Sequence, residues 1–111
     1  MLDEQQFRTA SAQTLERLQR ALEAASEDHD FDVDNKEGAL SIEFEDPPAK
    51  FVISPNAPVR QIWVSARVRS FKLDWNDALG AFALPDGRTL TKLIADVVSE
   101  QLATPVNLAI S

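Results

Sequence analysis

Apolar and polar side chains alternate in short segments, joined by turns of a few residues, through most of the chain between residues 31 and 84. A period of two is the pattern of a strand that buries one face and leaves the other in solvent. We expect turns at residues 35–38, 46–49, 67–70 and 76–80. Because a parallel crossover needs a dozen or more residues, strands joined this closely must be antiparallel.

The central strand of this predicted sheet combines a core face with an aromatic solvent face. About six strands are expected, near residues 30–34, 40–45, 50–54, 60–66, 71–75 and 81–84. Residues 54–58 contain two prolines and are expected to break regular structure before the central strand. In that strand Ile62 and Val64 point to one face and Trp63 to the other. A large aromatic side chain on the solvent face of a sheet indicates contact with another molecule.

Amphipathic helices are expected at both ends of the chain. Apolar side chains recur every three or four residues over residues 4–25 and again over residues 90–102. Asp3 and Thr89 are suitable N-caps, and Pro105 stops the second helix. All 111 residues are therefore expected to form a single domain of the α+β class. It is a two-layer α/β sandwich, with both helices on one face of the antiparallel sheet.

The composition excludes several classes of protein. The chain has no cysteine, which rules out disulfides, thiolate metal sites and cysteine nucleophiles. One histidine, His29, and three glycines leave no nucleophile elbow or phosphate-binding loop, so we do not expect an enzyme. No apolar run approaches the roughly 20 residues that cross a bilayer, and the N-terminus resembles neither a signal nor a transit peptide. A cytoplasmic protein that does not bind membranes is the expectation.

Negative charge is concentrated in the first half of the chain. The net charge is −7, and ten of the 18 acidic residues lie between Glu23 and Asp46, opposed there only by Lys36. Such a segment repels phosphate, so nucleic acid is not an expected partner. Carboxylate oxygens suit hard cations such as Mg, Ca, Mn and iron, or a basic protein surface. A charged face that only keeps the protein soluble is the alternative interpretation.

Two aromatic motifs follow one another in the second half of the chain. Pro58-Val-Arg-Gln-Ile-Trp-Val-Ser65 precedes Phe71-Lys-Leu-Asp-Trp75, and both are followed by Asp86-Gly87 and a leucine-rich terminal helix. In this order they resemble the frataxin family, bacterial type, and the resemblance covers nearly the whole chain. It implies a frataxin-like fold and an iron-binding protein, or iron chaperone, of iron–sulfur cluster assembly. It further implies docking on the cysteine desulfurase–scaffold complex, whose rate such a protein regulates.

The resemblance also implies particular site residues. An acidic ridge would bind Fe(II) and Fe(III) weakly and reversibly through Glu4, Glu23, Glu27, Asp28, Asp30, Asp32, Asp34, Glu43 and Glu45. The partner-binding residues that it implies are Gln61, Trp63, Lys72, Ser54 and Asn56. The first helix is less acidic than is usual in the family, with Gln19 and Arg20 in its second half, so iron binding is expected to shift towards residues 27–34. Ser54 stands where the family usually has asparagine.

Two other functions fit the same residues. Ridge carboxylates could hold iron while oxygen oxidises it, as in a ferroxidase or an iron-storing oligomer. An acidic protein-interaction domain without a metal role is the other alternative. We expect a monomer, with iron-dependent oligomers as the alternative state.

Overall fold

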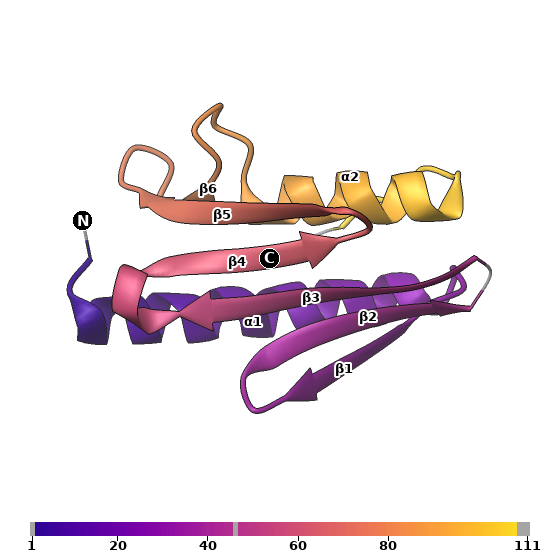
Figure 1. Ribbon diagram of the computed structural model, residues 1–111, viewed down its shortest axis with the longest axis horizontal. Coiled ribbons are helices and arrows are strands. Elements are labelled where there is room, and N and C mark those ends of the chain that lie inside the picture. Colours follow the sequence, from indigo (N-terminus) through magenta and orange to yellow (C-terminus); the bar gives the residue numbers. More distant parts are fainter. Residues whose placement is uncertain (1, 46, 109–111) are drawn as a thin grey trace.

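Two helices lie on one face of a six-stranded antiparallel sheet in the computed structural model, which describes residues 2–45 and 47–108 (Figure 1). The elements in chain order are α1 (Glu4–Ser26), β1 (Asp32–Lys36), β2 (Ala39–Glu45), β3 (Pro48–Asn56), the 3-10 helix η1 (Ala57–Val59), β4 (Gln61–Ala66), β5 (Arg69–Asn76), β6 (Ala81–Ala83) and α2 (Leu90–Leu102). Each strand pairs with its neighbours in sequence, and every pairing is antiparallel. The expected α+β sandwich is confirmed.

Both helices begin at the predicted caps. The Asp3 carboxylate accepts a hydrogen bond from the Gln6 backbone N–H (2.8 Å), and the Gln6 side chain accepts one from the Asp3 N–H (3.0 Å), which makes a capping box. At the start of α2 the Thr89 hydroxyl accepts from the Lys92 N–H (3.3 Å). α2 ends where Ala103 takes a φ of 55°, a left-handed conformation typical of helix C-termini.

One apolar core fills the space between the sheet and the helices. Phe7 on α1 meets Phe82 on β6 edge-to-face, with ring centroids 5.6 Å apart. The ring of Trp75 on β5 packs on Phe82 at 5.2 Å, as expected for a core residue, and its indole N–H donates to Asp77 (3.1 Å). The largest fully buried side chains are Phe7, Phe51, Phe82, Leu18, Leu22, Leu40, Ile42, Ile53, Ile62, Leu73, Leu93 and Ile94.

The third strand is longer than expected, and the predicted break at residues 54–58 is wrong in its first half. β3 starts at Pro48 and continues through Pro55 to Asn56, and only then does η1 turn the chain. Pro55 lies opposite Ile62 on β4 but beyond Ile53, the last β3 residue that pairs with β2. The N–H that proline lacks therefore leaves no gap between β2 and β3, which is where a strand tolerates proline.

The hairpin turn between β1 and β2 is tighter than predicted. The ladder closes at Lys36 opposite Ala39, so only Glu37 and Gly38 form the turn. Their φ angles are 54° and 85°, and two consecutive positive φ values match the right-handed twist of the flanking strands. This short connection places the outward side chains of β1 and β2 directly beside each other.

Candidate functional site

The outward face of the sheet, away from both helices, carries Trp63 near its middle. Trp63 is 38% exposed, whereas its neighbours Ile62 and Val64 on β4 are buried on the opposite face. The alternation predicted from the sequence is therefore confirmed for this strand. Across the ladder, Trp63 faces Ser54 on β3 and Lys72 on β5.

Hydrogen bonds and a cation–π contact hold the indole in place. The Trp63 Nε1–H donates to the Gln61 Oε1 atom (2.9 Å), and the Gln61 Nε2–H donates to Asp74 Oδ1 on β5 (3.1 Å). The Lys72 Nζ atom lies 4.9 Å from the centroid of the Trp63 ring. One edge and one face of the indole thus contact other side chains, and 38% of the residue is exposed to solvent.

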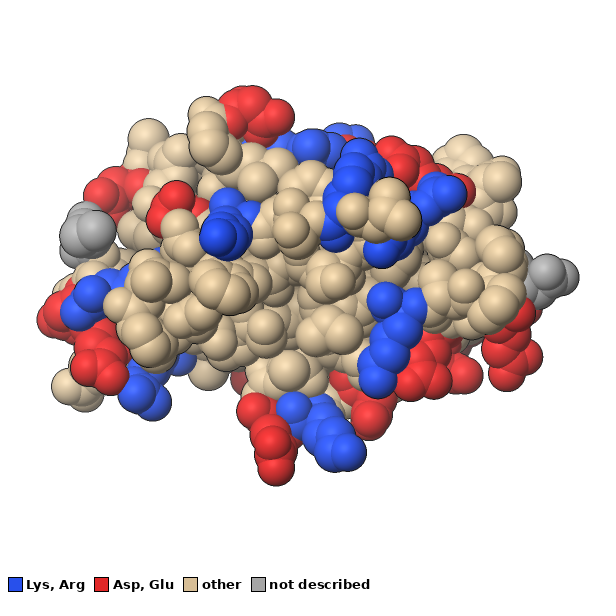
Figure 2. All heavy atoms as spheres, in the orientation of Figure 1, with Lys and Arg blue, Asp and Glu red and all other residues tan. Residues whose placement is uncertain are grey.

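All five residues of the expected partner-binding set lie together on adjacent strands. Asn56 is opposite Gln61, as Ser54 is opposite Trp63 and Trp63 opposite Lys72. We call this set, Ser54, Asn56, Gln61, Trp63 and Lys72, the Trp63 face. Figure 2 shows the outward side of the sheet: its middle is mostly uncharged (tan), and charged side chains gather around the rim. That the Trp63 face binds a partner stays a prediction.

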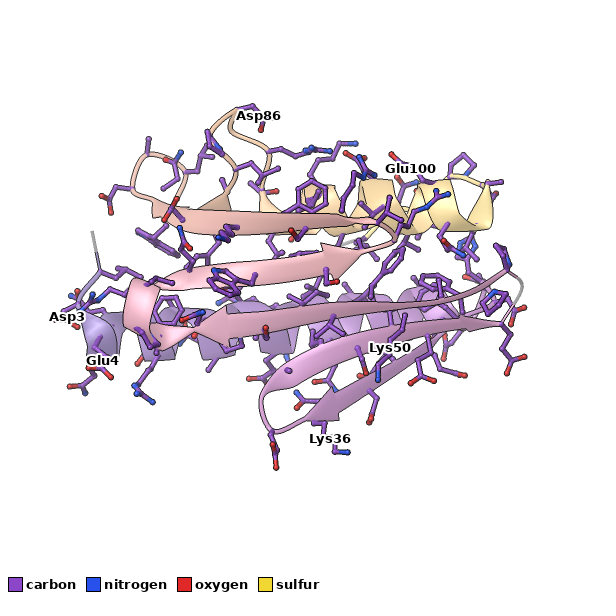
Figure 3. All side chains as sticks on the ribbon, viewed as in Figure 1. Asp3, Glu4, Lys36, Lys50, Asp86 and Glu100 are labelled. Carbon is purple, nitrogen blue, oxygen red and sulfur yellow. The ribbon has the colours of Figure 1, made fainter. Side chains whose placement is uncertain are left out.

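The acidic ridge is most closely packed on β1 and β2. Asp32 lies directly opposite Glu43 on the outward face, and both carboxylates are exposed. Asp34 and Glu45 lie on the same two strands, one outward position away in opposite directions. Like charges in directly opposed positions repel each other. Lys50 on β3, opposite Glu43, offsets that repulsion with its Nζ atom 3.8 Å from Glu43 Oε1 (Figure 3).

The α1 contribution to the ridge divides into two distant parts. Glu23 and Glu27 are exposed at the C-terminal end of α1, and the loop that carries Asp28 and Asp30 leads from there to β1. Glu4 lies at the other end of a 23-residue helix, roughly 34 Å away at 1.5 Å per residue. Figure 3 shows Glu4 at the N-terminal end of the molecule, well away from Lys50. The structure therefore does not bring Glu4 together with the other ridge carboxylates.

Arginines on α1 further reduce its negative character. The Arg8 guanidinium is 2.8 Å from the Glu4 carboxylate, and its hydrogen bond and charge hold the pKa of Glu4 below the usual value. Glu16 and Arg20, four residues apart on α1, also form an ion pair. Both pairs are exposed and salt-screened, so each contributes little to stability. Their main effect is to leave the β1–β2 end of the ridge as the more strongly negative region.

The ridge lacks a convergent metal cage. Within residues 2–45 and 47–108, no three His, Asp or Glu side chains are grouped as metal ligands would be. A cation on this surface would be held by one or two carboxylates and complete its shell with water. Such a site is weak and exchanges readily, and its oxygen donors favour hard ions.

Comparison with known proteins agrees with this geometry. The family model for the frataxin-like domain matches residues 1–104. This chain belongs to the frataxin family. It is 36% identical over 91 residues to the iron-sulfur cluster assembly protein CyaY of Azotobacter vinelandii, covering 79% of this chain and 82% of that protein. It is 29% identical over 114 residues to the protein of the same name from Cupriavidus metallidurans, covering 96% of each.

Structural comparison leads to the same fold. A solved structure described as frataxin from Psychromonas ingrahamii superposes with a TM-score of 0.82 at 19% identity, covering 97% of this chain and 99% of that one. Among the residues that the structure describes, none of the helices is long and apolar enough to cross a bilayer.

Two residues of this frataxin-family site were not singled out from the sequence. Asp74 accepts from Gln61, and Lys50 faces Glu43. In the sequence, Asp74 alternates with the apolar Leu73 and Trp75, which predicts a place on the solvent face. Which β4 residue it meets depends on the register of the two strands. The partner of Lys50, Glu43, likewise lies on another strand, so this pair also depends on strand register.

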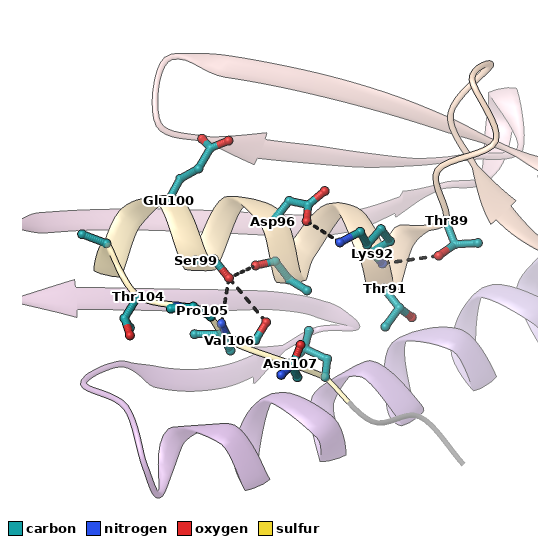
Figure 4. A pocket seen from close by; sticks show the side chains of 13 residues that line it. Thr89, Thr91, Lys92, Asp96, Ser99, Glu100, Thr104, Pro105, Val106 and Asn107 are labelled. Carbon is teal, nitrogen blue, oxygen red and sulfur yellow. Dashed lines mark hydrogen bonds and ion pairs between the residues drawn. The ribbon is translucent and has the colours of Figure 1, made fainter.

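A groove on the opposite side of the molecule is separate from this site. It has a volume of about 680 Å³ and runs between α2 and residues 104–108 (Figure 4). The Ser99 hydroxyl donates to the Ala95 carbonyl (2.6 Å) and accepts from the Val106 backbone N–H (2.9 Å). The apolar residues in 106–110 predict that the segment after α2 packs back onto the domain, and Val106, in the described part of this segment, is buried. Residues 109 and 110 of that prediction lie outside the described residues.

The N-terminal half of α2 carries a second charged group. Asp96 accepts from Arg88 (3.2 Å) and Lys92 (3.0 Å). Partial burial raises the pKa of Asp96, but the hydrogen bonds and charges of Lys92 and Arg88 outweigh it, so the pKa lies below the usual aspartate value. The Arg88–Asp96 pair joins α2 to the loop that precedes it.

Proposed function

We propose that this protein is a non-enzymatic, iron-binding component of iron–sulfur cluster biogenesis that regulates a cysteine desulfurase–scaffold complex. Membership of the frataxin family and the names of its relatives support the pathway. The single observation that carries the proposal in this chain is the partly exposed Trp63, fixed on the outward face of the sheet by neighbours from two strands.

The Trp63 face has the properties of a docking surface. Tryptophan is among the residues that contribute most to protein–protein binding when they enter a pocket on the partner. Here the indole is already oriented, and the middle of the outward side of the sheet is mostly uncharged (Figure 2). The acidic ridge lies beside it on β1 and β2 and would favour a partner whose surface around that pocket is basic.

Iron enters this proposal as cargo on the ridge. Asp32 and Glu43 present two opposed carboxylates, and a divalent ion between them would relieve their repulsion. Lys50 already provides part of that relief, so metal must compete with its ammonium group. Few ligands and a competing cation both predict weak, reversible binding, as delivery to another protein requires.

A titration followed by two-dimensional NMR tests the iron role. Anaerobic Fe(II) is added to the ¹⁵N-labelled protein, with Mg²⁺ in a parallel sample as diamagnetic control. Broadening confined to residues 23–34 and 43–45 supports iron binding on the ridge. Uniform broadening, or none below millimolar iron, would contradict it and leave an interaction domain without a metal role.

Enzyme assays test the regulatory role and the main alternative. Sulfide release by a purified cysteine desulfurase–scaffold complex is measured with increasing amounts of the protein and of Trp63→Ala. A change in rate that the variant fails to produce supports regulation through the Trp63 face. Oxygen consumption over many turnovers in the presence of Fe(II) would instead favour a ferroxidase.

A further inference from the structure

Two residues of the Trp63 face, Trp63 and Gln61, form a chain of hydrogen bonds that ends at Asp74, a residue with no assigned role. Asp74 on β5 accepts from Gln61 on β4, and Gln61 accepts from the indole of Trp63, over 3.1 Å and 2.9 Å. The register explains the order, because Gln61 is directly opposite Asp74 while Trp63 is two residues further along β4, on the same face. Trp63 therefore connects to Asp74 through the Gln61 amide.

The chemistry of the three groups allows only one direction of hydrogen bonding. An indole N–H is a donor without acceptor capacity, and an ionised carboxylate is an acceptor without donor capacity. The Gln61 amide has one end of each kind, so its oxygen must face Trp63 and its NH₂ must face Asp74. With the amide rotated by 180°, donor would face donor at Trp63 and acceptor would face acceptor at Asp74. Asp74 thus selects the amide orientation that holds the indole.

A second contact further restrains the orientation of the indole. The Lys72 ammonium lies over one face of the ring, 4.9 Å from its centroid, while Gln61 holds the ring edge. These two restraints act in different directions, so they define the ring plane as well as its position. An ordered side chain loses less conformational entropy when it enters a partner's pocket than a freely rotating one does.

We propose that Asp74 is a positioning residue of the Trp63 face: through the Gln61 amide it orients the indole for docking. This inference rests on the proposed docking function and adds a residue to it. Asp74 need not touch the partner, because its effect is transmitted within the protein. The inference predicts that docking depends on the acceptor oxygen of residue 74 and does not depend on its negative charge.

Two substitutions separate the acceptor from the charge. Asp74→Ala removes both, and Asp74→Asn removes the charge but keeps an oxygen that can accept from Gln61. Glu37→Ala, in the exposed β1–β2 turn, is the matched control for loss of one negative charge. The fold of each variant is checked by far-UV circular dichroism and by its thermal midpoint.

The first readout is the indole Nε1–H resonance of Trp63 in ¹H–¹⁵N spectra. The chain has two tryptophans, and the Trp75 indole N–H donates to Asp77, so its exchange rate with solvent is compared with that of Trp63 in every sample. Asp74→Ala should shift the Trp63 signal and speed its exchange with solvent more than that of Trp75. Asp74→Asn should keep the Trp63 signal near its wild-type position. An unmoved Trp63 signal in Asp74→Ala would overturn the inference.

The second readout is affinity for the purified cysteine desulfurase–scaffold complex. Asp74→Ala should dock roughly twofold to tenfold more weakly, the range expected for ordering one mobile side chain on binding, while Asp74→Asn and Glu37→Ala stay within twofold. Equal losses in Asp74→Ala and Asp74→Asn would mean that charge is responsible, and the inference would fail. If Trp63→Ala weakens docking and Asp74→Ala does not, only this inference is wrong. If Trp63→Ala has no effect either, the docking function itself is wrong.

Discussion

Asp32 and Glu43 stand directly opposite each other on β1 and β2, with their carboxylates on the solvent face of the sheet. Directly opposed like charges destabilise a strand pair by a few tenths of a kcal/mol or more. Lys50, on the next strand across, is the neighbour that offsets this repulsion. A metal ion and Lys50 therefore act on the same two carboxylates.

Replacing Lys50 with glutamine should strengthen cation binding and weaken the metal-free fold. Without the ammonium group, Asp32 and Glu43 repel each other more strongly and attract a divalent ion more strongly. We expect a loss of about 0.2–1 kcal/mol in the free energy of unfolding at low salt, because the pair is exposed. Added salt or divalent metal should reduce that loss. Urea denaturation and a metal titration by NMR measure the two effects.

Lys36→Gln is the matched control for Lys50→Gln. Lys36 also lies on the outward side of the sheet, at the end of β1 beside the hairpin turn, and its loss makes the same change in net charge. If both variants bind metal equally tightly, the effect comes from overall charge and the local competition is disproved.

Trp63→Ala should keep the fold and weaken docking. The side chain is partly exposed, so its removal is expected to cost about 1 kcal/mol or less of stability. Loss of a central aromatic anchor typically costs about 2 kcal/mol or more in binding, which is roughly a thirtyfold loss of affinity. Affinity for the desulfurase–scaffold complex and the urea midpoint are the measurements.

Val68→Ala is a suitable comparison for Trp63→Ala. Val68 is fully exposed in the turn between β4 and β5, outside the Trp63 face. Its variant should dock as the wild type does. A Trp63→Ala protein that fails to fold would show instead that the indole is part of the core.

Ser99→Ala should loosen the segment that follows α2. The Ser99 hydroxyl is the acceptor for the Val106 N–H, and a backbone donor without its partner costs about 1–3 kcal/mol when buried. Hydrogen exchange at the Val106 amide should accelerate, and the free energy of unfolding should fall by about 1–2 kcal/mol.

Ser26→Ala makes the same chemical change at an exposed position. Ser26 is the last residue of α1, and its hydroxyl donates to the Glu23 carbonyl. Its variant should change stability by about 0.5 kcal/mol or less. Unchanged exchange at Val106 in Ser99→Ala would mean that packing alone holds this segment.

Asp96→Asn should reduce stability at neutral pH and much less in acid. The pKa of Asp96 is lowered in the folded state, so its contribution is fully present above the unfolded value of about 4 and is lost as the pH falls through the folded value. At pH 7 we expect a deficit of about 1 kcal/mol relative to wild type, since two partly exposed ion pairs are lost. At pH 3 the deficit should be smaller.

Urea denaturation at both pH values checks the Asp96 prediction. Glu37→Gln, a carboxylate-to-amide change in the β1–β2 turn, serves as the control and should stay close to wild type throughout. A stability deficit of the Asp96→Asn protein that grows as the pH falls would contradict a lowered pKa of Asp96 in the folded state.

Local patterns along the chain were sufficient to predict the fold. Both caps, the stripe on α1 and the alternation around Trp63 depend on residues within about four positions of each other. Short connections then left only an antiparallel order. The first half of the predicted break at residues 54–58 was wrong because the sequence shows only which residues precede and follow Pro55 in the chain. Whether Pro55 interrupts a strand depends on where the adjacent strand ends.

Strand register and element length decided the site. The sequence alone placed Asp32 and Glu43 on solvent faces, but their alignment in one row with Lys50 follows from two independent pairings. The family resemblance grouped Glu4 with the acidic ridge, but the length of α1 separates Glu4 from the other ridge carboxylates. The link from Trp63 to Asp74 likewise exists only in the folded sheet. Alternation with a period of two determines which face of the sheet a residue occupies. Its neighbours on that face depend on the register of adjacent strands, which is set by the packing of the whole core.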